Sequence, residues 1–323
     1  MAALLTSPSS RLTADRRSEL EEHAYRIRRL ALEMIAWGQW GHIGGSFSMA
    51  EILAVLYFNE LNVDPARPAW AGRDRLLLSK AHGSPALYAA LALRGYFDET
   101  EIYGYTELGG LLEGHTDMTR TPGLESSGGP LGMGLSVAVG RAIGLRMQHR
   151  PRPRVYCILG DGILGDGEIL GDGECNEGNV WEAAMAASHY GLDNLIAVVD
   201  YNKVMAKGAV SRLMSVEPFA AKWEAFGWVV LEVDGHDLET LAEAFYRARW
   251  ILPHGQPIAV IAHTVKGRGV EQAEFNPAWH THAPDARTAD SMLRELARRY
   301  GRPDEGYTRL EWSAAKETFY GGE

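Results

Sequence analysis

The sequence predicts an α/β fold with a mostly parallel sheet flanked by helices on both faces. Short runs rich in β-branched residues alternate with stretches of helical periodicity, which is typical of successive β-α-β units. These runs are largely apolar, as expected for strands that are buried on both faces. With 323 residues, 46% of them apolar, the chain is also long enough to bury a large core.

The expected elements follow one another along the chain. Residues 18–37 place apolar side chains at helical spacing, and Ser48 with Glu51 forms a capping-box pattern that opens a second helix. Residues 75–79 form a short apolar run before a small-residue loop and a further helix. Predicted strands occupy residues 154–159, 194–200, 228–234 and 257–264. Helical stretches separate them, for example residues 179–190 and 237–252.

We expect one domain over residues 18–285, with a flexible tail before it (1–17) and a polar helical tail after it (286–323). The net charge is −10 and no basic cluster stands out, so nucleic acid is not an expected partner. Cys157 and Cys175 are too few for a disulfide framework or a zinc site. No signal peptide or long apolar run is present, so we expect a soluble cytoplasmic protein without membrane contact.

Residues 158–174 contain the sequence Ile-Leu-Gly-Asp-Gly three times, and only the third copy runs directly into an Ala-rich helix, a strand and Asn202. In that copy Gly171 and Gly173 flank Asp172, so the backbone can turn sharply and approach a ligand closely. The helix points its N-terminus toward the turn, where anions are stabilised. Asp172 and Asn202, 30 residues apart, supply hard oxygens of the kind that Mg²⁺ takes together with phosphate oxygens.

This Gly-Asp-Gly-to-Asn unit resembles the thiamine-diphosphate motif, in which an aspartate and an asparagine hold the metal from either end of one helix and one strand. Two other interpretations remain. Gly-Asp-Gly also makes ordinary turns. Calcium β-rolls contain similar repeats, but their repeat has about nine residues, whereas the period here is five and then six.

Four further segments extend the resemblance, at residues 40–58, 73–97, 111–144 and 262–284. In content and order, these segments and the Gly-Asp-Gly-to-Asn unit are similar to the N-terminal, diphosphate-binding half of a transketolase. The resemblance implies the thiamine-diphosphate-binding fold, with thiamine diphosphate and Mg²⁺ (or Ca²⁺ or Mn²⁺) as cofactors. The implied activity is transfer of a two-carbon ketol unit from a ketose or its phosphate to an aldose or its phosphate. This reaction belongs to carbohydrate metabolism, such as the pentose phosphate reactions.

A complete transketolase continues with a pyrimidine-binding domain and a C-terminal domain. The resemblance therefore implies a separately encoded N-terminal subunit that works with a second polypeptide carrying the pyrimidine-binding domain. A 2+2 heterotetramer is the expected assembly, or a homodimer of this chain alone. Three alternatives remain: the α chain of a 2-oxo-acid dehydrogenase, a deoxyxylulose-phosphate-synthase-like protein, or an inactive homologue impaired by an insert at residues 160–170.

The resemblance also implies roles for particular residues. The expected metal ligands are Asp172, Asn202 and the backbone carbonyl of Val204. The expected cofactor contacts are His82, Gly129, Leu131, Gly171, Asp172, Gly173, Asn202 and His280. The expected catalytic residues are His42, His82, His115, His280 and Glu177. In this family, imidazoles shuttle protons to and from the sugar oxygens, and an acid at the position of Glu177 belongs to a network at the subunit interface.

Some of these assignments have alternatives. His282 competes with His280, which we prefer because it follows Trp279 as the motif does. Glu177 can equally be an acid that is favoured at a helix N-terminus. We expect loop-bracing or solvated roles for the remaining polar residues near the motifs: His236, His254, His263, Lys266 and Arg268.

The chain departs from the family in two places. Between Asn202 and Gly208 it has Lys-Val-Met-Ala-Lys, where many transketolases carry a glutamine and an acid, in the loop expected near the thiazole ring. Residues 160–170 form an excursion just before the expected metal loop. We hypothesise that the excursion loops out while Asp172 keeps the site. Alternatively, the identical copies compete for the site, their extra acids weaken cofactor binding, or the excursion is a duplication without function.

Overall fold

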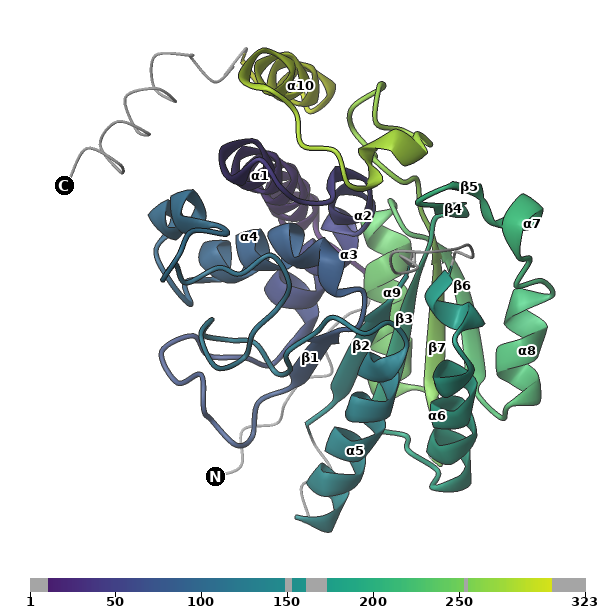
Figure 1. The fold of residues 1–323 in the computed structure, drawn as a ribbon. Coiled ribbons are helices and arrows are strands. Elements are labelled where there is room, and N and C mark those ends of the chain that lie inside the picture. The colour runs from purple at the N-terminus through teal and green to yellow at the C-terminus, as the bar shows by residue number, and fades with distance from the viewer. Residues whose placement is uncertain (1–10, 149–152, 161–172, 253–254, 304–323) are drawn as a thin grey trace.

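The computed structural model describes residues 11–148, 153–160, 173–252 and 255–303 (Figure 1). At its centre lies a five-stranded sheet with the strand order β1-β2-β3-β7-β6, in which every neighbouring pair is parallel. The strands are β1 (Arg75–Leu78), β2 (Val155–Leu159), β3 (Leu195–Tyr201), β6 (Val229–Asp234) and β7 (Ile258–His263). The predicted fold class and the four predicted strands are confirmed, and the apolar run at 75–79 supplies the fifth strand.

The remaining elements surround this sheet. A two-stranded antiparallel hairpin, β4 (Val204–Met205) and β5 (Gly208–Ala209), follows β3. The helices are α1 (Ala14–Gly38), α2 (Ile43–Ser48), α3 (Ala50–Val55), α4 (Ser84–Arg94), α5 (Met133–Met147), α6 (Gly178–His189), α7 (Val210–Leu213), α8 (Phe219–Ala225), α9 (Leu238–Trp250) and α10 (Ala286–Arg299). Single turns of 3-10 or π helix lie at Leu56–Glu60, Ala81–Gly83, Glu99–Gly104, Gly173–Asn176 and Pro277–His280. Over the described part of the chain, no helix combines the length and apolarity that a membrane span requires.

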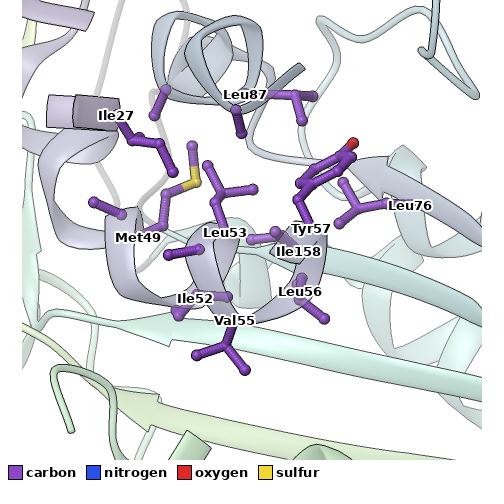
Figure 2. Packing of buried hydrophobic residues seen from close by; sticks show 14 of the residues in the cluster. Ile27, Met49, Ile52, Leu53, Val55, Leu56, Tyr57, Leu76, Leu87 and Ile158 are labelled. Atoms are coloured by element: carbon purple, nitrogen blue, oxygen red, sulfur yellow. The ribbon is translucent and has the colours of Figure 1, made fainter. Parts of the chain in front are cut away.

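Helices cover both faces of the sheet (Figure 1) because alternate strand residues enter two separate apolar clusters. In β2, Tyr156 and Ile158 join the cluster that includes α1, α3, α4 and α9, whereas Cys157 and Leu159 join the cluster that includes α5, α6 and α8. Figure 2 shows the first cluster, where side chains of α3 and the following turn meet those of α1, α4 and the strands, among them Ile27, Leu87, Leu76 and Ile158. Burial on both faces explains why β2 is apolar throughout, whereas β6 at the edge of the sheet is partly exposed and carries Glu232 and Asp234.

The predicted capping box is wrong. α2 ends at Ser48, and α3 follows with Met49 as its N-cap and without a capping side-chain hydrogen bond. The Ser48 hydroxyl instead donates to the carboxylate of Asp200 (2.5 Å), and Glu51 pairs with the buried guanidinium of Arg28 (2.6 Å). Tertiary partners thus replace the local pairing that the pattern predicts.

α1 and α10 begin close to the two ends of the predicted domain, residues 18 and 285. α1 begins at Ala14, capped by Thr13, so its first turn lies inside the range 1–17 that we expect to be a tail. α10 begins at Ala286, and the side chain of Asp285 caps it. α10 covers the first part of the range 286–323, and residues 304–323 lie outside the described part of the chain.

The loops that follow the strands meet at one edge of the sheet because all the strands run parallel. Ligands bind at this carboxyl edge in open α/β sheets. β1 leads into residues 79–82, β2 into Gly160, β3 into Asn202 and β7 into residues 264–266. Several of the expected functional residues therefore follow these strands directly.

Candidate active site

Four of the predicted histidines come together although they are far apart in the sequence. The ring centroid of His42 lies 5.2 Å from that of His82, 5.3 Å from that of His280 and 6.2 Å from that of His115. His82 and His280 are 5.2 Å apart. We call these four residues the histidine cluster. His42, His82 and His280 are buried, whereas His115 is half-buried.

Each histidine is placed by a different element. His42 is the N-cap of α2, His82 lies in the turn after β1, and His280 ends the turn Pro277–His280. The turn into His42 requires Gly41, because its φ is +140° and an added Cβ would lie 2.6 Å from Ile35. Burial lowers the pKa of His115 below its usual value, so this ring is neutral at pH 7.

His280 is distinguished from the alternative His282 by its surroundings. His280 is buried within the histidine cluster. His282 is exposed, and its ring contacts Trp279 at 5.1 Å. The choice of His280 as the residue that faces the cluster therefore agrees with the geometry.

The expected metal ligands are partly described. Asn202 is 1% exposed at the carboxyl end of β3, and its Oδ1 accepts a hydrogen bond from the backbone N–H of Val204 (3.1 Å). The Nδ2 group of Asn202 has no hydrogen-bond partner among the described residues. Gly173 is buried at the start of the turn Gly173–Asn176. Gly171 and Asp172 lie outside the described residues, so their roles stay predictions.

Lys266 corrects an expectation, because its side chain is not solvated. It is fully buried, and its Nζ donates to the carbonyl of Val204 (2.9 Å) and to Nδ1 of His280 (2.8 Å). A protonated lysine can only donate, so Nδ1 of His280 accepts and Nε2 carries the ring proton. Arg268, two residues further on, is exposed as expected.

A buried ion pair stands beside this group. Lys80 and Asp200 are both completely buried, and the ammonium of Lys80 contacts the carboxylate of Asp200. Asp200 also accepts hydrogen bonds from the hydroxyls of Ser48 and Thr264. These contacts tie together the ends of β1, β3 and β7 and the end of α2, as a buried charge requires several partners.

Glu174 is a further buried acid that the sequence motifs do not single out. Its carboxylate accepts hydrogen bonds from the backbone N–H groups of Gly132 (2.9 Å) and Gly160 (3.0 Å) and from the hydroxyl of Ser79. Burial outweighs these bonds and raises the pKa of Glu174 to about 7. The side chain joins the loops after β1 and β2 to the loop before α5. Its position directly after the third Gly-Asp-Gly was the available signal.

Two of the expected cofactor contacts, Gly129 and Leu131, lie in the loop before α5. Gly129 is exposed and Leu131 is partly buried, and the Leu131 carbonyl accepts a hydrogen bond from Nδ2 of Asn179 (3.5 Å). Glu177 is the N-cap of α6, is partly exposed and makes no capping hydrogen bond. An added Cβ on Gly132 would lie 2.8 Å from the Cβ of Glu177, so this loop packs against the start of α6.

Of two further histidines, His236 braces a loop as expected, whereas His263 ends β7 and contacts the neighbouring strand β6. His236 contacts Glu51 through Nδ1 (2.9 Å), and its Nε2 accepts a hydrogen bond from the backbone N–H of Val265 (2.8 Å). His263 contacts Glu232 through Nε2 (2.8 Å). His254 lies outside the described residues.

The arrangement fits a metal-bound diphosphate. The Asn202 amide and the Val204 carbonyl offer hard oxygens. The Nδ2 group of Asn202 has no hydrogen-bond partner among the described residues, so it can donate to an anion. The buried ammonium of Lys266 adds a positive charge beside them. An anion at this place therefore meets both charge and hydrogen-bond donors.

Comparisons with known proteins agree with this geometry. The chain is 42% identical over 267 residues to 6-deoxy-6-sulfo-D-fructose transketolase subunit SqwG of Clostridium sp. (strain MSTE9), covering 83% of this chain and 92% of that protein. It is 35% identical over 280 residues to an apulose-4-phosphate transketolase subunit of Phocaeicola vulgatus (strain ATCC 8482), covering 87% and 94%.

Solved structures give the same result. Transketolase from Leishmania mexicana superimposes with a TM-score of 0.79 and 27% identity, over 93% of this chain and 44% of that one. The chain thus spans less than half the length of this transketolase. The family described as "Transketolase, thiamine diphosphate binding domain" matches residues 20–305. The chain therefore belongs to the transketolase family and corresponds to its thiamine-diphosphate-binding domain.

Proposed function

We propose that this chain is the N-terminal subunit of a transketolase-type enzyme, which transfers a two-carbon ketol unit from a ketose or its phosphate to an aldose or its phosphate. The observation that carries the proposal is the convergence of the histidine cluster with Asn202 and the buried Lys266 at one edge of the sheet. This combination places proton carriers next to a site built for an anion. The names of the similar subunits, both transketolases, favour this role over the 2-oxo-acid dehydrogenase and synthase alternatives.

The proposed cofactor is thiamine diphosphate held by Mg²⁺ (or Ca²⁺ or Mn²⁺). Asn202 and the Val204 carbonyl would hold the metal together with Asp172, and Gly173 would allow the diphosphate to approach the backbone. When bound, thiamine diphosphate would supply a nucleophilic carbon for the ketose carbonyl and an electron sink for the two-carbon fragment. Gly129 and Leu131 would meet its aminopyrimidine.

The histidine cluster would handle the protons. His115 is neutral at pH 7, so it can accept a proton from a sugar hydroxyl. Lys266 fixes the Nδ1 of His280 as an acceptor, which leaves the Nε2–H as the donor. His42 neighbours both of them, and His82 neighbours His42 and His280, so one bound molecule could contact several of these rings.

Activity would need a second polypeptide. The relatives are named as subunits, which supports a separate partner that carries the pyrimidine-binding domain. We propose a 2+2 heterotetramer in the cytoplasm, with Glu177 in the network between subunits and a homodimer as the form without the partner. Size measurement of the chain with and without its partner subunit tests this assembly.

A thermal-unfolding experiment tests the cofactor directly. At a thiamine diphosphate concentration about 100 times Kd, with Mg²⁺ present, binding to the native chain alone should stabilise it by about 2.7 kcal/mol and raise Tm by several degrees. Asn202→Leu should remove most of this shift while the Tm of the cofactor-free chain stays close to wild type. An equal shift in Asn202→Leu, or no shift in the wild type at any concentration, would reject the proposed site.

The excursion at residues 160–170 gives a second test. Deleting it joins Leu159 directly to the third Gly-Asp-Gly, and residues 161–170 lie outside the described part of the chain. If the excursion loops out and Asp172 keeps the site, the Kd for thiamine diphosphate measured by calorimetry should change less than about twofold. Clearly tighter binding after the deletion would instead favour interference by the extra acids Asp161, Asp166 and Glu168.

A further inference from the structure

The segment that carries Lys266 is held through its own backbone. The N–H of Thr264 donates to the carbonyl of the last residue of β3 (3.2 Å), and the N–H of Gly267 donates to a carbonyl of α2 (3.0 Å). Between these two points, the N–H of Val265 donates to Nε2 of His236 (2.8 Å). The first two bonds join backbone to backbone, whereas the third depends on a side chain.

The position of this backbone decides where the Lys266 ammonium lies. The carbon stem of Lys266 runs close to α2, because an added Cβ on Gly44 would lie 2.9 Å from two of its carbons. Its Nζ then reaches the Val204 carbonyl (2.9 Å) and Nδ1 of His280 (2.8 Å). A buried stem that is packed this closely has little room to compensate for a shift of its backbone. Displacement of Val265 would therefore move the ammonium away from its acceptors.

The imidazole of His236 is bonded at both nitrogens. Because Nε2 accepts from Val265, the ring proton is on Nδ1, which donates to Oε2 of Glu51 (2.9 Å). Glu51 is held in turn by the completely buried Arg28, whose guanidinium also donates to the hydroxyl of Tyr300, the C-cap of α10. His236 thus connects a buried charged network of α1, α3 and α10 to the segment that carries Lys266.

The loop that carries His236 is fixed against the same segment. The N–H of Gly235 donates to the carbonyl of His263 (2.9 Å). A side chain does not fit at Gly235, because an added Cβ would lie 2.4 Å from the side chain of Thr264. The loops after β6 and β7 therefore pack directly on each other. This close approach holds the imidazole within hydrogen-bonding distance of Val265.

We propose that His236 is a positioning residue for the cofactor site: its Nε2 holds Val265 and thereby fixes the position of the Lys266 ammonium. The inference rests on the proposed function, in which Lys266 attracts the diphosphate. His236 acts through Lys266 rather than by touching the cofactor. Its effect on cofactor binding should therefore disappear when the ammonium is removed.

Two amide substitutions separate the two contacts of the ring. The longer side chain of His236→Gln can place its carbonyl near the position of Nε2 and accept from Val265. The shorter side chain of His236→Asn ends near the position of Nδ1, where it can donate to Glu51 but does not reach Val265. In isothermal titration calorimetry with Mg²⁺, His236→Asn should raise the Kd for thiamine diphosphate about tenfold. His236→Gln should stay within about threefold of wild type.

A double-variant cycle with Lys266→Met tests the route of the effect. Residues that act through one another show non-additive effects on a binding free energy. His236→Asn should therefore change Kd less than about twofold when Lys266 is already methionine. A further tenfold loss in that background would overturn the inference, because the effect would not pass through the ammonium. A loss in His236→Gln as large as in His236→Asn would also overturn it.

Hydrogen exchange of the cofactor-free chain gives a readout that does not depend on the cofactor. Residues 264–267 should exchange faster in His236→Asn than in the wild type, and at the wild-type rate in His236→Gln. The control is His263→Asn, since His263 ends β7 with a 39% exposed side chain and contacts Glu232 instead. It should change neither Kd nor the exchange of this segment.

The possible failures can be told apart. No binding of thiamine diphosphate by the wild type would reject the proposed function itself. Wild-type binding with an unchanged Kd in His236→Asn would overturn only the inference. A lower Tm of cofactor-free His236→Asn, with Kd and exchange of residues 264–267 unchanged, would also overturn it and leave His236 a purely structural role.

Discussion

Replacing Lys266 with methionine should weaken binding of thiamine diphosphate about a hundredfold. The buried ammonium donates to the Val204 carbonyl and to His280, so it places a positive charge next to a proposed metal ligand. A hydrogen bond that involves a charged group contributes about 1.5–3 kcal/mol, and the upper end of this range corresponds to roughly a hundredfold in affinity. Isothermal titration calorimetry in the presence of Mg²⁺ measures the change.

The matched control is Arg268→Met. It removes a positive charge two residues away that is exposed, so cofactor affinity should change less than about twofold. Lys266→Met should alter the unfolding free energy of the cofactor-free chain by only about 1 kcal/mol, since an apolar side chain of similar length fills the same space. Equal loss of affinity in both variants would mean that general electrostatics, not the position of Lys266, attracts the diphosphate.

Replacing Glu51 with alanine should destabilise the chain by about 3–5 kcal/mol, because it leaves a buried charge without its counterion. Arg28 is completely buried and pairs with both carboxylate oxygens of Glu51 (2.6 Å each), and the same carboxylate contacts His236. Urea unfolding measures the loss. The double variant Arg28→Met/Glu51→Leu removes both charges and should be less destabilised than Glu51→Ala. A double variant as unstable as the single one would show that packing, not the ion pair, accounts for the loss.

The same pair predicts a pH dependence. Burial alone would raise the pKa of Glu51, but Arg28 and His236 outweigh it and hold the pKa well below its usual value. A carboxyl whose pKa is lowered by folding stabilises the native state above its unfolded pKa of about 4.3 and loses this contribution as the pH falls further. The stability difference between wild type and Glu51→Ala should therefore be constant near neutral pH and shrink below about pH 4.

The strands could be predicted from the sequence because the apolar pattern of a buried strand lies within the strand itself. Strands buried on both faces are largely apolar, so the runs at residues 154–159 and 194–200 predict strands. The capping box failed for the opposite reason. Ser48 and Glu51 have the right spacing, but Asp200 and Arg28 are far away in the sequence and offer stronger partners. Local patterns do not show which side chains a distant element will engage.

The site was only partly predictable. The histidine cluster was expected from the family resemblance, and the residue pattern alone gives no distances between positions as far apart as His42 and His280. Lys266 and Glu174 were missed because charged residues beside glycines usually face solvent. Lys266 follows β7 and Glu174 bonds to Gly160 after β2, so both lie at the carboxyl edge, where ligands bind in such sheets. That position is a better guide than residue type.

The proposed function depends on a metal-bound diphosphate held at the end of β3. A crystal structure of the chain with thiamine diphosphate and Mg²⁺ tests it most directly. We predict an ion about 2.1 Å from the Asn202 Oδ1, the Val204 carbonyl and an Asp172 oxygen, with the diphosphate completing its coordination. A diphosphate bound elsewhere, or an ion that touches neither Asn202 nor Val204, would contradict the account.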